Sequence, residues 1–123
     1  MKHRHIPLGL RGDVFLAKLT RAEVETLFET GDYAKLLAPL LALLGPGGAV
    51  AAAVLGVFSG LGAKFFRDSH RKLGGAGMVL VLYRPLLGVA VSVNVAPNHF
   101  FSKKADAPAL KARNLLLPGR ILR

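Results

Sequence analysis

The sequence predicts an α+β fold, in which a small helical cluster around one central apolar helix is followed by an antiparallel β-hairpin and a basic C-terminal segment. Three observations lead to this prediction. Residues 36–63 carry no charge, and Ser59 is their only polar side chain. Valine alternates with small or polar residues over 89–96, which is the period of a β-strand. The last stretch, residues 98–123, is rich in lysine and arginine.

Length and composition limit the classes of protein that this chain can belong to. Its 123 residues are expected to form a single domain. Hydrophobic residues make up 52% of the chain, so wholesale disorder is not expected. The formal net charge is +10, and most of it lies in residues 64–123, where Asp68 and Asp106 are the only acids. Such a field favours anionic partners. The lack of cysteine excludes disulfides and thiolate chemistry.

The N-terminal residues 1–12 are predicted to be a basic arm. Ile6, Leu8 and Leu10 alternate with other residues and would allow a short strand. Pro7 cannot donate a backbone hydrogen bond, so that strand would have to lie at the edge of a sheet.

A helical region is expected over residues 13–73. Thr20 and Glu23 have the spacing of a capping box, which predicts the start of its first helix. Residues 33–72 are then expected to form an apolar helical hairpin, broken at the Gly-Pro-Gly-Gly run of 45–48.

The second arm of that hairpin, residues 49–72, is the predicted central helix. Its larger apolar side chains are expected on one face, formed by Val50, Val54, Val57, Phe58, Leu61 and Phe65. Ala52, Gly56 and Gly60 give it a second face of small residues, which is typical of a helix-packing interface. Up to Ala63 the helix is apolar on all sides, so it is expected to be buried in protein or in lipid.

A β-hairpin is predicted over residues 76–97, with strands at 78–84 and 87–96. The first strand is apolar on both faces, as expected for a strand that is covered on both sides. In the second strand, one set of side chains is expected to face the core, namely Val89, Val91, Val93 and Val95. Ser92 and Asn94 then point to the opposite face.

Eight cationic residues are candidates for binding an anionic partner. They are Lys64, Arg67, Arg71, Lys72, Lys103, Lys104, Lys111 and Arg113. The first four crowd the C-terminal end of the central helix, where they complement its dipole. The other four lie in the basic tail, residues 98–123. Lipid headgroups, acidic protein surfaces and nucleic-acid phosphates are all open as the anionic partner.

Membrane association is the favoured localisation, through the apolar segment 36–63. Residues 49–63 alone would make about 22 Å of helix, whereas a bilayer requires roughly 20 residues. A straight span, a re-entrant hairpin and a helix buried in a soluble core therefore all remain open. No cleavable signal peptide is expected, because the basic start is not followed directly by an apolar run.

Catalysis is not expected from this sequence. It contains no nucleophile elbow, P-loop or dinucleotide fingerprint. His3 and His5 have no acidic or cysteine neighbour in the arm, and this gives little support for a metal site. We expect no cofactor, no metal and no small-molecule substrate.

The sequence favours a non-catalytic structural or accessory subunit of a larger assembly, with other subunits or copies of itself as partners. One alternative is a membrane-permeabilising, pore-forming toxin. The stretch 49–72 is similar in composition to helices of membrane-active bacteriocins, in which small apolar residues are followed by a basic end. A second alternative is a basic, structural nucleic-acid-binding protein.

Overall fold

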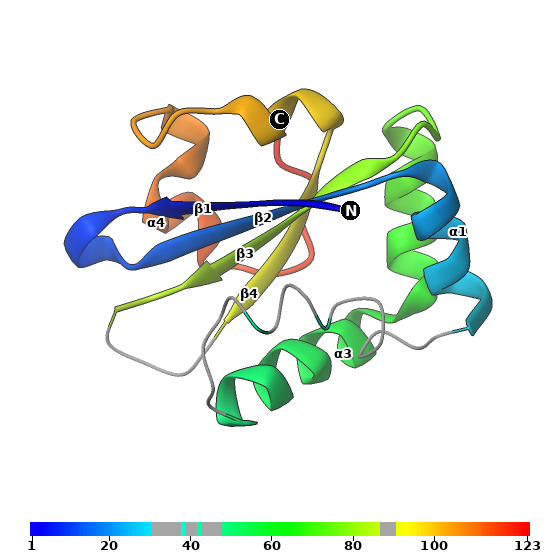
Figure 1. Cartoon of the computed structure of the whole chain (residues 1–123), viewed down its shortest axis with the longest axis horizontal. Coiled ribbons are helices and arrows are strands. Elements are labelled where there is room, and N and C mark those ends of the chain that lie inside the picture. Colours follow the sequence, from blue (N-terminus) through cyan, green and yellow to red (C-terminus); the bar gives the residue numbers. More distant parts are fainter. Residues whose placement is uncertain (31–37, 39–41, 43–47, 87–90) are drawn as a thin grey trace.

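The described residues of the computed structural model form a four-stranded antiparallel sheet with helices on both of its faces (Figure 1). The structure describes the chain except for residues 31–37, 39–41, 43–47 and 87–90. The strands are β1 (Lys2–Pro7), β2 (Asp13–Leu19), β3 (Met78–Arg84) and β4 (Ser92–Ala96). The α-helices are α1 (Arg21–Thr30), α3 (Gly48–Lys72) and α4 (Ala112–Leu115). Short 3-10 helices are η1 (Gly9–Arg11), η2 (Asn98–Ser102) and η3 (Pro108–Leu110).

The strands lie in the sheet in chain order, β1-β2-β3-β4, and each pair of neighbours is antiparallel. β1 and β2 are joined by the short turn that contains η1. The central pair, β2 and β3, joins strands that are separated in the chain by α1 and α3. In this pair Phe15 lies opposite Leu82, and Leu82 in turn lies opposite Val93 of β4.

Each face of the sheet has its own hydrophobic core. On one face, α1 and α3 cover the sheet, and the fully buried side chains there include Phe15, Leu19, Leu80, Val93, Val24, Leu27, Phe58 and Phe66. On the other face, η2, η3 and α4 cover it, and the buried side chains include Val14, Leu16, Val81, Phe100, Leu110 and Leu115. The protein therefore consists of three layers, with the sheet in the middle.

The predicted fold class is wrong. The core is built on a sheet, not on a central apolar helix with a helical cluster around it. Residues 13–19, which were expected to belong to a helical region, form the inner strand β2. This strand is covered on both faces, so that Val14, Phe15, Leu16 and Ala17 are all buried. A strand of this kind is a short continuous apolar run without alternation, and its sequence alone does not separate it from a helix.

The two basic ends of the chain are both packed on the sheet. The basic arm contains the edge strand β1, and Pro7 is the last residue of that strand, consistent with its expected place at an edge. The tail, residues 98–123, covers one face of the sheet. Its last residues also run beside β4, where the amide of Leu122 donates to the carbonyl of Val95 at 2.7 Å. The outer edge of β4 is thereby paired over these residues.

Of the predicted strands 78–84 and 87–96, the first is β3 and the second is described over Ser92–Ala96 as β4, which pairs with β3 in antiparallel orientation. Val91, Val93 and Val95 lie in the core beneath α1 and α3, as expected. Val89 lies outside the described residues. Ser92 and Asn94 point to the other face, but that face is buried as well, because the tail covers it.

Helix α3 spans the predicted central helix, with one interruption. At Gly62 the backbone has φ 77° and ψ 163°, which is not helical. In an unbroken helix the residue seven positions after Phe58 would return to the same face, which predicts Phe65 in the core. The interruption at Gly62 moves the core-facing position by one residue, from Phe65 to Phe66. Phe66 is fully buried and stacks on Phe58 with 5.0 Å between ring centroids, whereas Phe65 is partly buried.

Most of the first arm of the predicted apolar hairpin, including Pro39, lies outside the described residues. Among the helices that the structure does describe, none combines the length and the hydropathy needed to cross a membrane.

Candidate functional site

A cationic pocket of about 470 Å³ lies at the end of the sheet where β1 begins and β2 passes into α1. Lys2 comes from β1, Lys18 from β2, and Arg21 is the first residue of α1. The opposite wall is formed by Ala76 and by Asn98, the first residue of η2. We refer to this as the N-terminal pocket.

Lys2 and Lys18 are directly opposite each other in the β1–β2 pair. Both side chains point to the tail-covered face, because they alternate with the residues that face the other layer. Like charges at directly opposed positions of an antiparallel pair destabilise the sheet. Within the part of the chain that the structure describes, neither lysine forms an ion pair with an acidic side chain. The pair is therefore a local excess of positive charge.

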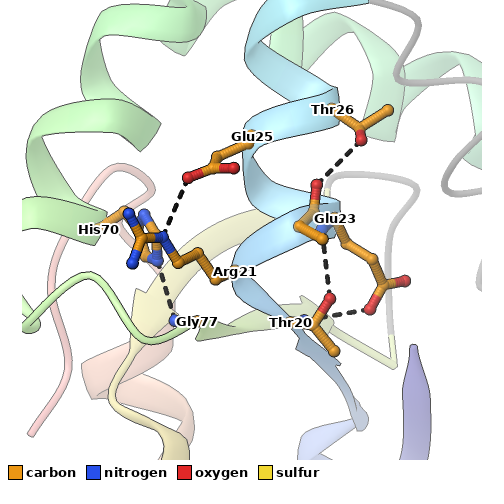
Figure 2. Close-up of polar contacts among 8 residues, drawn as sticks. Thr20, Arg21, Glu23, Glu25, Thr26, His70 and Gly77 are labelled. Atoms are coloured by element: carbon orange, nitrogen blue, oxygen red, sulfur yellow. Dashed lines mark hydrogen bonds and ion pairs between the residues drawn. The ribbon is translucent and has the colours of Figure 1, made fainter.

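The acidic groups near the pocket are engaged by other partners (Figure 2). Glu25 accepts a hydrogen bond from Nε of Arg21 at 3.0 Å. Glu23 accepts one from the backbone amide of Thr20 at 3.0 Å, and its other oxygen lies 3.0 Å from the amino group of Met1. Burial raises the pKa of Glu23, but the hydrogen bonds from Thr20 and the Met1 amino group outweigh it and leave the pKa lowered.

The predicted capping box is confirmed and fixes the position of Arg21. The amide of Glu23 donates to Oγ1 of Thr20 at 3.2 Å, while the Glu23 carboxylate binds the Thr20 amide in return. These two bonds satisfy donors that the start of α1 would otherwise leave free. They set the turn between β2 and α1, and with it the direction in which Arg21 leaves the sheet.

A close backbone contact and a buried histidine hold the β3 side of the same region. Gly77 has φ 107°, and a Cβ atom there would lie 2.5 Å from the carbonyl oxygen of Leu19. The amide of Gly77 donates to Nε2 of His70 at 2.9 Å (Figure 2). Burial lowers the pKa of His70, and the positive charge of Arg21 lowers it further. The neutral ring is the form that can accept this hydrogen bond.

A second, smaller pocket of about 230 Å³ lies next to the first. Lys72, His99 and Arg123 line it. The two pockets are neighbours because Asn98 lines the first and His99 the second. Nδ2 of Asn98 donates a hydrogen bond to the carbonyl of Ala76 at 3.3 Å, and both residues line the first pocket.

Exposed leucines gather at the opposite end of the sheet. Leu10, in η1, is 90% exposed; Leu86, after β3, is 55% exposed; and Leu116 and Leu117, after α4, are 56% and 64% exposed. We call this group the leucine end.

Contacts between the three segments place these leucines at the same end of the sheet. The hydroxyl of Tyr83 donates to the carbonyl of Arg11. Gly12 packs so closely that a Cβ atom would lie 3.0 Å from the amide nitrogen of Leu86. Tyr83 also lines a pocket of about 260 Å³ together with Leu116 and Pro118. The β1–β2 turn, the end of β3 and the end of α4 therefore meet here.

The predicted helix-packing residues lie on the surface of the described structure. Ala52, Gly56 and Gly60 are exposed. A Cβ atom built on Gly56 or Gly60 meets no atom within 4 Å. The expected close packing is thus not made within the described part of the chain, and contact with a partner stays a prediction.

The eight predicted cationic residues fall into two groups on opposite sides of the sheet. Lys64, Arg67, Arg71 and Lys72 lie on α3, which covers one face. Lys103, Lys104, Lys111 and Arg113 lie in the tail, which covers the other face. Lys72 lines the smaller pocket, close to the N-terminal pocket. Their roles in binding stay predictions.

One polar cluster on the sheet involves a histidine and a carboxylate. Nε2 of His5 lies 2.7 Å from Oδ1 of Asp13, and the guanidinium of Arg84 lies 3.2 Å from Oδ2. The His5 ring stacks on Phe15 with 4.7 Å between centroids. The hydrogen bond to His5 is the main cause that lowers the pKa of Asp13, and Arg84 adds to it. Among the described residues no group of three or more His, Cys, Asp or Glu side chains could hold a metal ion.

Comparison of the chain with protein-family models, curated proteins and solved structures gave no match. The N-terminal pocket was not predicted from the sequence. Lys2 lies far from Lys18 and Arg21 in the sequence. The three residues line one pocket because β1 and β2 pair. Recognition of residues 13–19 as a strand would have placed Lys2 opposite Lys18.

Proposed function

We propose that this chain is a non-catalytic accessory protein that docks on an anionic membrane surface through its leucine end. The observation that carries this proposal is the grouping of four exposed leucines from three separate segments. Single exposed leucines are common on protein surfaces, whereas a group of them at one end is typical of an interaction site.

Cations flank these leucines. Arg11 follows Leu10 directly and is exposed. Arg113 is exposed and precedes Leu116 by three residues, which places the two on neighbouring positions of a helical turn. Leucines that enter the edge of the acyl layer, with arginines at the level of the headgroups, are the arrangement of peripheral membrane proteins.

The expected binding energy fits reversible attachment. Burial of one leucine side chain contributes about 1.5–3 kcal/mol, and each cation close to an anionic leaflet contributes about 1 kcal/mol. Two leucines and two arginines would therefore contribute about 5–8 kcal/mol before the cost of association. The apolar segment 36–63 could add to this attachment, although most of its first part, residues 36–47, lies outside the described residues.

Flotation with lipid vesicles tests this proposal. We expect the chain to float with vesicles that contain phosphatidylglycerol and to remain unbound with vesicles of phosphatidylcholine alone. The double substitution Leu10→Ser and Leu116→Ser should abolish flotation without a change in the free energy of unfolding, because both side chains are exposed in the free protein.

Charge substitutions provide the matched control. Arg11→Gln with Arg113→Gln should weaken flotation, whereas Lys64→Gln with Lys104→Gln removes the same charge elsewhere and should have a smaller effect. If the control pair weakens flotation as much as the first pair, the leucine end is not the docking surface, and general attraction to the basic chain explains the binding.

A further inference from the structure

We propose that the N-terminal pocket binds the phosphate group of a small molecule, held by Lys2 and Lys18. The phosphate site lies at a different end of the sheet from the leucine end, and only the choice of a soluble ligand over a lipid headgroup rests on the proposed membrane docking. The leucine end includes the β1–β2 turn, whereas the pocket lies where β1 begins, and six residues of strand span about 20 Å. Figure 1 shows these two ends of β1.

The cross-strand lysine pair is the first step in the argument. Lys2 and Lys18 are held opposite each other by the β1–β2 register, and this register is fixed by the burial of Ile6, Val14 and Leu16. The two ammonium groups therefore cannot separate by a shift of the strands. A doubly charged oxyanion between them would turn this repulsion into two attractive contacts.

The donors around the pocket fit a phosphate. Arg21 also lines the pocket, but its side chain is directed toward Glu25 and His70 (Figure 2), so the two lysines supply the charged donors. Oγ1 of Thr20 accepts from the Glu23 amide, and its own proton is therefore available to donate to a ligand oxygen. Both lysine side chains are flexible enough to reach one group.

Neighbouring charges do not cancel this preference. Glu23 carries a negative charge close to the pocket, but the amino group of Met1 and the amide of Thr20 are bound to it. Glu25 is bound to Arg21. After these pairs are formed, the positive charges of Lys2 and Lys18 remain. The pocket volume of about 470 Å³ leaves room for the organic part of a phosphorylated ligand beside Ala76 and Asn98.

The source of the phosphate follows from the position of the pocket. Since the pocket lies at the other end of the sheet from the leucine end, a chain that is docked through its leucines would present the pocket away from the bilayer. A soluble phosphorylated molecule could then bind it, whereas a lipid headgroup of the same bilayer could not.

The experiment is a titration of the full chain with inorganic phosphate and with glycerol phosphate, followed by the chemical shifts of backbone amides at constant ionic strength. We expect shifts centred on residues 18–21 and 76–77, and no comparable shifts with chloride. Lys18→Gln and Lys2→Gln should each weaken binding by about tenfold or more. Lys104→Gln removes an exposed lysine from the tail and should leave binding unchanged.

Thermal unfolding gives a second readout that is independent of any function. Without phosphate, Lys18→Gln should unfold at the same temperature as the parent chain or at a higher one, because the substitution removes a like-charge contact. With phosphate, only the parent and Lys104→Gln should gain stability. If Lys18→Gln does not fold, Lys2→Gln, on the edge strand, serves for the same comparison.

Three outcomes would overturn the proposal. These are no saturable binding of either phosphate by the parent, equal weakening by Lys104→Gln, and unchanged binding in both Lys2→Gln and Lys18→Gln. Loss of vesicle flotation in Lys2→Gln would show that the lysines contact lipid headgroups, and this would also overturn the assignment to a small molecule.

Discussion

Nε2 of His70 accepts a hydrogen bond from the backbone amide of Gly77, with 2.9 Å between the two nitrogen atoms. This bond joins the last turn of α3 to the segment that enters β3, and so links the helical layer to the central strand. It requires a neutral imidazole, because a protonated ring has no acceptor left.

Acidification should therefore destabilise the protein through His70. Its pKa in the folded state is lowered from the ordinary value of 6.5, first by burial and then by Arg21, while Glu25 acts in the opposite direction. The unfolded chain then binds more protons than the folded chain as the pH falls below 6.5. The contribution of His70 is complete above pH 6.5 and is lost as the pH falls through the folded-state pKa.

Urea unfolding at pH 7.5 and at pH 5.5 measures this effect. We expect a lower free energy of unfolding at the acidic pH, and we expect His70→Gln to reduce the difference between the two values. His3→Gln, at an exposed position of β1, should leave the difference intact. An identical pH dependence in the parent and in His70→Gln would show that another group carries it.

Substitutions in β4 should show whether both faces of this strand are buried, or only one face as in an ordinary half-exposed strand. Val93 is fully buried beneath α3, so Val93→Asp places an unpaired carboxylate in the core and should cost about 4 kcal/mol or more. Ser92→Asp should also be destabilising, by about 1–3 kcal/mol, because Ser92 is 7% exposed and its hydroxyl donates to the carbonyl of Leu115. In a half-exposed strand Ser92→Asp would have little effect, and chemical denaturation decides between the two expectations.

Gly77→Ala should be strongly destabilising, and a nearby glycine supplies the control. Gly74 and Gly77 both have positive φ, at 99° and 107°. A side chain at Gly74 meets no atom within 4 Å, so Gly74→Ala should incur only the backbone strain of about 1–3 kcal/mol. Gly77→Ala adds a contact of 2.5 Å with the carbonyl of Leu19 and should cost clearly more. Equal thermal stability of the two variants would contradict the close approach of these strands.

Leucine substitutions on the small-residue face of α3 test whether it is an interface with another molecule. Because Gly56 and Gly60 are exposed, Gly56→Leu and Gly60→Leu should not destabilise the isolated chain, and the better helix propensity of leucine could stabilise it by up to about 1 kcal/mol. If the face packs against a partner, the same substitutions should abolish assembly. Sedimentation measures assembly, and denaturation of the isolated chain measures stability. A large loss of stability in the isolated chain would show that the face is already packed within it.

The sequence predicted the local features of this protein well, but not how they combine. The capping box of Thr20 and Glu23 and the alternating valines of β4 act over a few residues, and their patterns are visible in the sequence. β2 gave no such signal, because it is buried on both faces and its apolar residues are consecutive. The partner strands β2 and β3 also lie far apart in the chain, so no turn motif indicates their pairing.

The same limit applies to the candidate sites. The charge density of the tail suggested a free basic surface, but Phe100, Leu110 and Leu115 anchor this segment on the sheet. These apolar residues are spaced irregularly, since they lie in η2, η3 and α4 and not in one long helix. The cationic pocket was missed because it depends on the register that places Lys2 opposite Lys18, and residues 13–19 were not recognised as a strand.

The contact between the first strand and the tail has a consequence for the order of folding. The guanidinium of Arg4 donates to the carbonyls of Phe101 and Lys103, at 2.8 and 2.7 Å, and Leu122 pairs with β4. During synthesis, the tail-facing side of β1 can therefore be covered only after residues 101–122 have left the ribosome. Until then Val14, Leu16 and Val81 form an apolar surface open to water. Non-local contacts of this kind slow folding, and the nascent chain is expected to need protection from aggregation until residues 101–122 have been synthesised.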